Sequence, residues 1–92
     1  MKSKLMERDE LVSKIHSQRF KIMQHYMFLY ADRLDGLPCR YDRYNEGKLS
    51  GSKEGDACHR SLLLIHQEEL ILASMLEQLE VLSGKVQQYL IN

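Results

Sequence analysis

Residues with metal-binding side chains occur in the middle of the chain: Cys39, Cys58, His59 and His66. Two ligands on one helix must be three or four residues apart to bind the same ion, whereas His59 and His66 are seven apart, about 10 Å along a helix axis. The sequence has no Cys-x-x-Cys pair. We therefore predict no metal site and no cofactor, with Cys58 as a small core residue and Cys39 as a loop thiol.

The two cysteines could instead form a disulfide. Cys39 and Cys58 both lie near the turn between the two predicted helices, so the bond is sterically conceivable. However, the amino terminus carries charges where a signal peptide would have its apolar core, and apolar runs such as residues 62–65 are far below the roughly 18 residues of a membrane-spanning helix. We therefore expect a cytoplasmic chain that does not bind a membrane, and cytoplasmic redox conditions argue against the disulfide.

Carboxylates that could serve as a general acid and base are present at Glu68 and Glu69. Neighbouring residues of a helix point about 100° apart, so these two side chains cannot act on one substrate atom. The sequence also lacks a glycine-rich phosphate loop, a nucleophile elbow and a His-x-x-x-His pair. These patterns predict a protein that is not an enzyme.

The segment CRYDRY, residues 39–44, repeats an Arg-Tyr pair at Arg40 with Tyr41 and at Arg43 with Tyr44. Arginine and tyrosine are enriched in the hot spots of protein interfaces, and both can stack on unpaired bases. We therefore take these four residues as a candidate partner-binding site. A second interpretation stays open, in which the tyrosines pack back over the end of the molecule and contact no partner.

Two long helices must position these residues, and the first is predicted to span about residues 4–35. At about 100° per residue, most of its apolar side chains fall on one half of the helix. They are Leu11, Val12, Ile15, Ile22, Met23, Tyr26, Met27, Leu29, Tyr30 and Leu34, with Phe20 at the edge. Gly36 and Pro38 mark the end of this helix, because glycine adopts the left-handed conformation after a last turn and proline cannot continue a helix.

The second helix is predicted to span about residues 55–90, with Ser52 or Asp56 as its capping residue. Residues 36–54 between the helices, rich in glycine and without sustained periodicity, predict a loop. The apolar stripe of the second helix, which we expect to contact the first, consists of Leu64, Ile65, Ile71, Leu72, Met75, Leu76, Leu79, Leu82, Val86, Tyr89 and Leu90. Gly84 weakens the helix by about 1 kcal/mol relative to alanine.

These elements predict an all-α fold, a single domain of residues 1–92 built as a long antiparallel two-helix hairpin. In such a hairpin, two residues whose numbers sum to about 88 lie opposite each other on the two helices. This register places Arg19 beside Glu68 and Glu69. We predict a partly buried ion pair between the helices there, an arrangement that more often specifies register than adds stability. The alternative is that Arg19 extends to the edge of the apolar face and keeps its guanidinium in water.

Three apolar residues of the second helix, Leu63, Leu70 and Val81, lie on the side opposite its stripe, where a hairpin would leave them in water. An exposed apolar row usually marks an interface. We therefore predict a homodimer that forms a four-helix bundle, with these three residues at the oligomer interface.

The overall composition argues against one class of function, nucleic-acid binding. The 92 residues are 43% hydrophobic and 28% charged, with a formal net charge of zero, so the chain lacks the basic character of most nucleic-acid-binding proteins. We interpret it as a small homo-oligomeric module that binds another protein, as an adaptor, chaperone or inhibitor. The alternative is a regulator that binds nucleic acid through Lys14, Lys21, Arg40 and Arg43.

Overall fold

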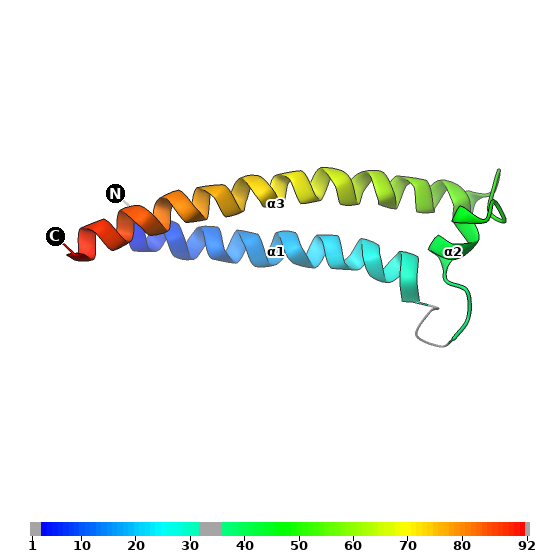
Figure 1. Cartoon of the computed structure of the whole chain (residues 1–92), viewed down its shortest axis with the longest axis horizontal. Helices are drawn as coiled ribbons and strands as arrows, with labels where there is room; N and C mark the ends of the chain where they lie inside the picture. The colour runs from blue at the N-terminus through cyan, green and yellow to red at the C-terminus, as the bar shows by residue number, and fades with distance from the viewer. Residues whose placement is uncertain (1–2, 32–35, 92) are drawn as a thin grey trace.

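The computed structural model describes residues 3–31 and 36–91, of which 86–91 are described by backbone alone. The described part is all-α and contains three helices, α1 (Lys4–Tyr30), α2 (Arg40–Asn45) and α3 (Lys53–Ile91). α1 lies side by side with α3, which extends beyond it at both ends, and α2 lies at the end where the chain reverses (Figure 1). The molecule measures 60 × 25 × 18 Å. The predicted helical hairpin is therefore confirmed.

The two long helices begin at serine caps. The Ser3 hydroxyl accepts a hydrogen bond from the Met6 backbone N–H, 3.1 Å away. The Ser52 hydroxyl accepts one from the Gly55 N–H, 3.0 Å away, so Ser52 is the capping residue of α3 rather than Asp56. α3 continues through Gly84 without interruption.

The described part of α1 ends at Tyr30, and the predicted last turn falls on residues 32–35, which lie outside the described residues. Gly36 adopts a φ of +77°, in agreement with its predicted left-handed conformation.

The predicted loop 36–54 contains a helix that the sequence analysis missed. Cys39 caps the start of α2. Its thiol accepts a hydrogen bond from the Asp42 N–H while the Asp42 carboxylate accepts one from the Cys39 N–H, each 3.4 Å long. This reciprocal arrangement is a capping box with cysteine in the place of serine or threonine. Cys39 is fully buried, so its predicted role as a loop thiol is corrected to that of a buried capping residue.

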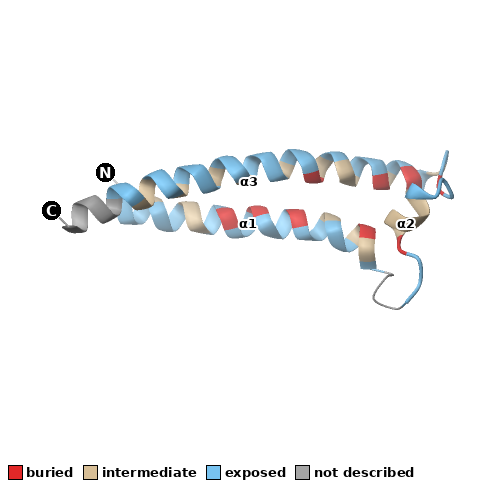
Figure 2. Ribbon diagram, viewed as in Figure 1, coloured by how far each residue is buried: buried red, intermediate tan, exposed pale blue. Residues whose placement is uncertain are grey.

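The core lies between α1 and α3, and α2 and the turn before α3 contribute to it at one end. Figure 2 shows the buried residues of the two helices on the sides that face each other, towards the end that carries α2. The buried hydrophobic residues of the described chain are Ile15, Ile22, Leu29, Cys39, Leu49, Cys58 and Ile65. Leu49, in the turn before α3, packs so closely that a Cβ on Gly55 would lie 2.1 Å from its carbonyl oxygen, which explains why position 55 lacks a side chain.

α3 covers only part of the apolar half of α1. Ile15, Ile22 and Leu29 are buried against it, whereas Met23 and Met27 are 48% and 60% exposed. A half-circle of apolar side chains is wider than the stripe that one neighbouring helix covers, so the remainder faces solvent. Among the described residues, no helix combines the length and the apolar character that a bilayer crossing requires.

Candidate interaction surfaces

The outer face of α1 carries the most closely grouped exposed apolar side chains of the long helices. Phe20, Met23 and Met27 are 55%, 48% and 60% exposed. Their spacing of three and then four residues places them on one side of the helix, and that side points away from the buried Ile22 and Leu29. We call Phe20, Met23 and Met27 the α1 outer face.

A shallow hollow of about 260 Å³ adjoins this face, lined by Met23, Tyr26, Met27, Tyr30 and Ala31. Its volume is below the 300–1,000 Å³ typical of small-molecule pockets, so it fits an apolar side chain better than a cofactor. Tyr26 and Tyr30 stack with ring centroids 6.2 Å apart, and Tyr30 contacts Tyr41 of α2 at 5.1 Å. The Tyr26 hydroxyl donates to a Glu69 carboxylate oxygen 2.8 Å away, and this hydrogen bond, with burial and the Glu69 charge, raises the pKa of Tyr26.

A hydrogen bond from an uncharged side chain stands where the inter-helix ion pair was predicted. The buried side-chain amide of Gln18 donates to both the backbone carbonyl oxygen, 2.9 Å away, and the carboxylate of Glu68. Arg19 is exposed, and within the described residues no ion pair joins it to Glu68 or Glu69. Adjacent residues point about 100° apart, so the rotation that turns Gln18 towards α3 turns Arg19 towards water. The alternative interpretation of Arg19, an exposed guanidinium, describes the structure.

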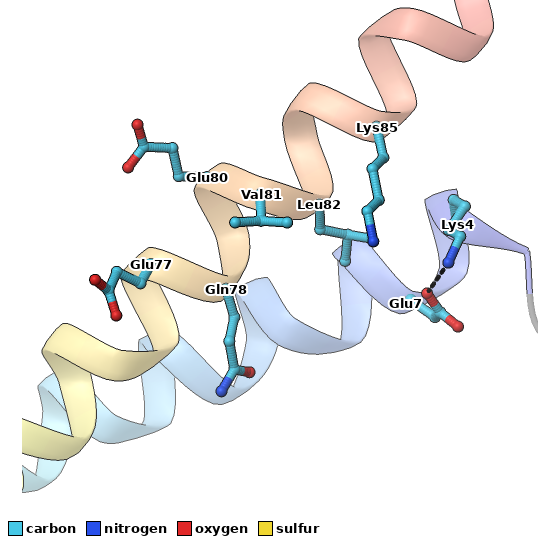
Figure 3. A pocket seen from close by; sticks show the side chains of 8 residues that line it. All are labelled: Lys4, Glu7, Glu77, Gln78, Glu80, Val81, Leu82 and Lys85. Carbon is cyan, nitrogen blue, oxygen red and sulfur yellow. Dashed lines mark ion pairs between the residues drawn. The ribbon is translucent and has the colours of Figure 1, made fainter.

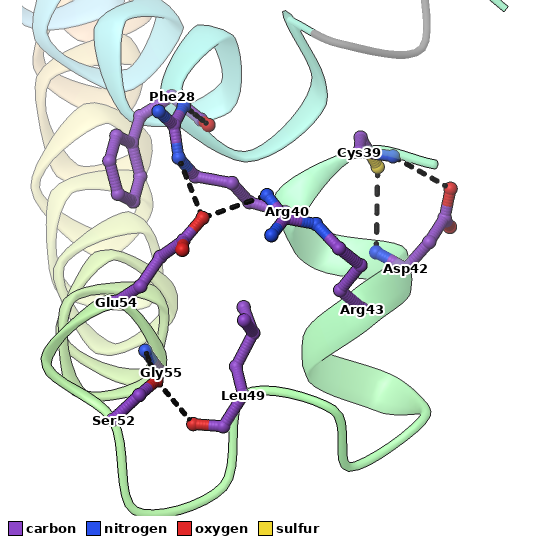
Figure 4. Close-up of polar contacts among 9 residues, drawn as sticks. All are labelled: Phe28, Cys39, Arg40, Asp42, Arg43, Leu49, Ser52, Glu54 and Gly55. Carbon is purple, nitrogen blue, oxygen red and sulfur yellow. Dashed lines mark hydrogen bonds and ion pairs between the residues drawn. The ribbon is translucent and has the colours of Figure 1, made fainter. Parts of the chain in front are cut away.

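The two arginines of the CRYDRY segment converge on one carboxylate, as Figure 4 shows. Arg43 donates to Glu54 of α3 across 2.8 Å, and Arg40 lies 3.3 Å from the same oxygen. Arg40 also donates to the Phe28 carbonyl oxygen across 3.0 Å, with its guanidinium 4.5 Å from the centre of the Phe28 ring. These contacts join α2 to both long helices.

The two tyrosines of the segment also contact their own chain. The Tyr44 hydroxyl lies 3.1 Å from His59 Nδ1, and Tyr41 packs on Tyr30. All four candidate residues, Arg40, Tyr41, Arg43 and Tyr44, are half-buried. Their arrangement agrees with the second interpretation, in which the segment packs over the end of the hairpin, and partner binding by these residues stays a prediction.

The predicted oligomer interface lies on the side of α3 that faces away from α1. Leu63, Leu70 and Val81 are 53%, 60% and 60% exposed. The exposed residues Ser74 and Glu77 separate Val81 from the other two, so the row is not continuous. Its exposure is as the sequence predicted, and its role as an interface remains a prediction.

Both cysteines are free thiols, so the disulfide is not formed. Burial is the main cause that raises the pKa of Cys58, and the nearby Glu54 charge adds to it. Within the described residues, no three His, Cys, Asp or Glu side chains are grouped so as to hold a metal ion.

A larger depression lies near the chain termini, and Figure 3 shows the side chains around it. Its lining consists of Lys4, Glu7, Glu77, Gln78, Glu80, Val81, Leu82 and Lys85. Lys4 and Glu7 form an ion pair with N and O 3.6 Å apart, and both side chains are largely exposed. Ligand sites are mostly apolar and enclosed, whereas long solvated charges surround this depression, so we assign it no ligand.

No protein-family model, curated protein or solved structure matches the chain. The surface that sequence reasoning missed is the α1 outer face, because we expected the apolar stripe of the second helix to contact the first and did not separate covered from uncovered residues of the apolar half of α1. A signal was available in the i, i+3, i+7 spacing of Phe20, Met23 and Met27 on a side of the helix without charges.

Proposed function

We propose that the chain is a small helical protein–protein interaction module that acts as a homo-oligomer in the cytoplasm, as an adaptor, chaperone or inhibitor of a protein partner. One observation carries this proposal. The described chain buries seven hydrophobic residues but leaves twelve large hydrophobic side chains exposed. They are Leu5, Met6, Phe20, Met23, Tyr26, Met27, Leu37, Leu63, Leu70, Ile71, Leu76 and Val81.

The balance of exposed and buried side chains supports association. Scattered apolar residues on a surface are ordinary, but grouped ones rimmed by polar residues mark interaction sites. Methionine and aromatic residues, which form the α1 outer face, are enriched in protein interfaces because they offer large apolar area with adaptable packing. Two faces are available to a partner, the α1 outer face and the α3 row of Leu63, Leu70 and Val81.

The nucleic-acid alternative has less support. Two of its four cations, Arg40 and Arg43, are engaged with Glu54, which leaves Lys14 and Lys21 exposed on α1. Phosphate binding would give an affinity that falls steeply with salt. A mobility-shift titration at two salt concentrations separates this alternative from the proposal, which predicts no shift of DNA or RNA at moderate salt.

Chemical cross-linking in cells, followed by purification of the tagged chain and mass spectrometry, tests the proposal. We expect cross-links to a second copy and to a partner protein, and we expect Phe20→Glu combined with Leu63→Glu to reduce both. Both positions are exposed, so this variant should keep its helical content. A chain recovered without any cross-linked protein at native abundance would contradict the proposal.

A further inference from the structure

The α1 outer face presents both a projecting side chain and a hollow. Phe20 is 55% exposed, and the hollow lined by Met23, Tyr26, Met27, Tyr30 and Ala31 follows one to three turns later on the same helix. In a two-fold symmetric contact, residue i of one copy meets residue j of the other, and j meets i. A second copy turned end for end therefore brings each Phe20 to the hollow of its partner.

The lack of charged side chains on this side of α1 also favours contact with a second copy. From residue 13 to residue 31, the side that carries Phe20 contains no Asp, Glu, Lys or Arg. Its members are Ser13, His16, Ser17, Phe20, Met23, Gln24, Met27 and Ala31, and all eight are exposed. A solvated helix surface usually carries interspersed charges, about a quarter to a third of its residues. Two copies of an uncharged face meet without like charges opposed, whereas a strongly acidic or basic partner would find no counter-charge on it.

We propose that the α1 outer face is the contact of a homodimer in which two α1 helices pack antiparallel about a two-fold axis near Met23. This inference rests on the self-association in the proposed function and names the surface that mediates it. Phe20 of one copy lies level with Met27 of the other, and the two Met23 side chains meet at the axis. Two cations flank the face, Arg19 on one edge and Lys21 on the other. At 1.5 Å per residue, the two Arg19 side chains are then about 13 Å apart along the helices and the two Lys21 side chains about 7 Å, so only the lysines lie within the screening length of about 10 Å at 0.1 M salt and oppose association.

The competing surface on α3 fits a second copy less well. Its row of Leu63 and Leu70 is interrupted by Ser74 and Glu77 before Val81. Two-fold packing around the middle of this longer row brings the charged carboxylate of Glu77 into the contact, where its desolvation opposes association, whereas the polar side chains of the α1 side are not Asp, Glu, Lys or Arg. The sequence predicted the dimer contact on this α3 row. An experiment therefore has to distinguish a dimer formed through α3 from one formed through α1.

Light scattering after size exclusion, on the full chain from micromolar to millimolar concentration, locates the contact. The wild-type chain is expected to show a dimeric mass. Phe20→Glu with Met27→Glu is expected to raise the dimer dissociation constant at least about 100-fold, since two central apolar anchors are replaced by charges. Leu63→Glu with Leu70→Glu adds the same charge on α3 and is expected to leave the dimer intact.

The results separate the two proposals. A dimer lost only in the α3 variant overturns the α1 contact and leaves the proposed self-association standing. A wild-type chain that is monomeric throughout overturns both the α1 contact and the homo-oligomer, while a cross-linked partner protein would still support the interaction module. Circular dichroism of each variant checks that helical content is retained.

Cysteine cross-linking tests the antiparallel arrangement. Ser17 of one copy lies close to the level of Ala31 of the other, so a mixture of Ser17→Cys and Ala31→Cys chains should form a mixed disulfide dimer under mild oxidation. Chains carrying Ser17→Cys alone should remain uncross-linked. The native Cys39 and Cys58 are buried, and the wild-type chain measures how much disulfide dimer they form by themselves. A Ser17→Cys chain that cross-links to itself would indicate parallel helices and overturn the arrangement.

Discussion

The two ends of the hairpin are built differently. At the end that carries α2, three elements meet, and Leu29, Cys39 and Cys58 are fully buried. Towards the other end, no residue is buried from residue 4 to 14 or from residue 66 to 85 (Figure 2). One of the few polar contacts between the helices there is the 3.3 Å hydrogen bond from Arg8 to Ser83.

This difference shows what a third element contributes. Two parallel cylinders touch along a line, so each helix covers only one stripe of the other and no side chain between them is enclosed on all sides. The short α2 and the turn that places Leu49 close the gap at one end. The rest of the hairpin keeps its apolar edges exposed. The α1 outer face shows that one side of α1 stays uncovered even where the other side buries Ile22 and Leu29.

The largest effect on stability should come from a cavity at the end of the hairpin that carries α2. Leu29→Ala is expected to lower the free energy of unfolding by about 2 to 5 kcal/mol, because Leu29 is fully buried and its surroundings relax only partly. The control Leu82→Ala, at a half-buried position of the open end, should cost about 1 kcal/mol. Urea unfolding measures both, and equal losses would mean that the two ends are equally well packed.

A smaller effect is expected from the carboxylate that holds α2 in place. Glu54→Gln should lower stability by about 1 kcal/mol, since both arginine contacts weaken but the groups are partly exposed and screened by solvent. Hydrogen exchange of the α2 amides should accelerate, while exchange in the middle of α3 stays the same. Glu46→Gln, which removes the exposed 2.8 Å pair with Lys48, is the control and should change neither. Unchanged exchange in α2 would show that Glu54 does not hold this helix.

The smallest effect is a dependence of stability on pH. Burial and the Glu54 charge raise the pKa of Cys58 in the folded chain, so the neutral thiol is favoured there. The resulting stability is fully present below the thiol pKa of the unfolded chain, about 8.5, and is lost as the pH rises through the higher folded pKa. Denaturant midpoints from pH 7 to pH 10 should therefore fall. In Cys58→Ala, the denaturant midpoint should decrease less between pH 7 and pH 10. An unchanged decrease would mean that other groups, such as Tyr26, cause the pH dependence.

The sequence by itself determined the two long helices and their order. Apolar spacing near 3.6 residues identified both helices, and Ser52 and Asp56 were the two candidates for the cap of α3, because these signals depend on neighbouring residues alone. The exposure of Leu63, Leu70 and Val81 could also be predicted, since they lie opposite the stripe that meets α1. α2 had a local signal as well, the Cys39 and Asp42 spacing of a capping box, but cysteine is an unusual residue in that role.

Only the tertiary structure decided which residues of each apolar arc are covered. The sequence predicts which residues of α1 lie opposite Glu68 only to within a residue or two, and this is too coarse to tell Gln18 from Arg19. The two side chains point about 100° apart on the helix, so one is a buried amide and the other a solvated guanidinium. The position of α3 across the apolar half of α1 likewise decided that Ile22 is buried and that Met23 remains exposed. Helix rotation depends on how side chains from distant parts of the chain pack, and this information is not contained in the periodicity of either helix.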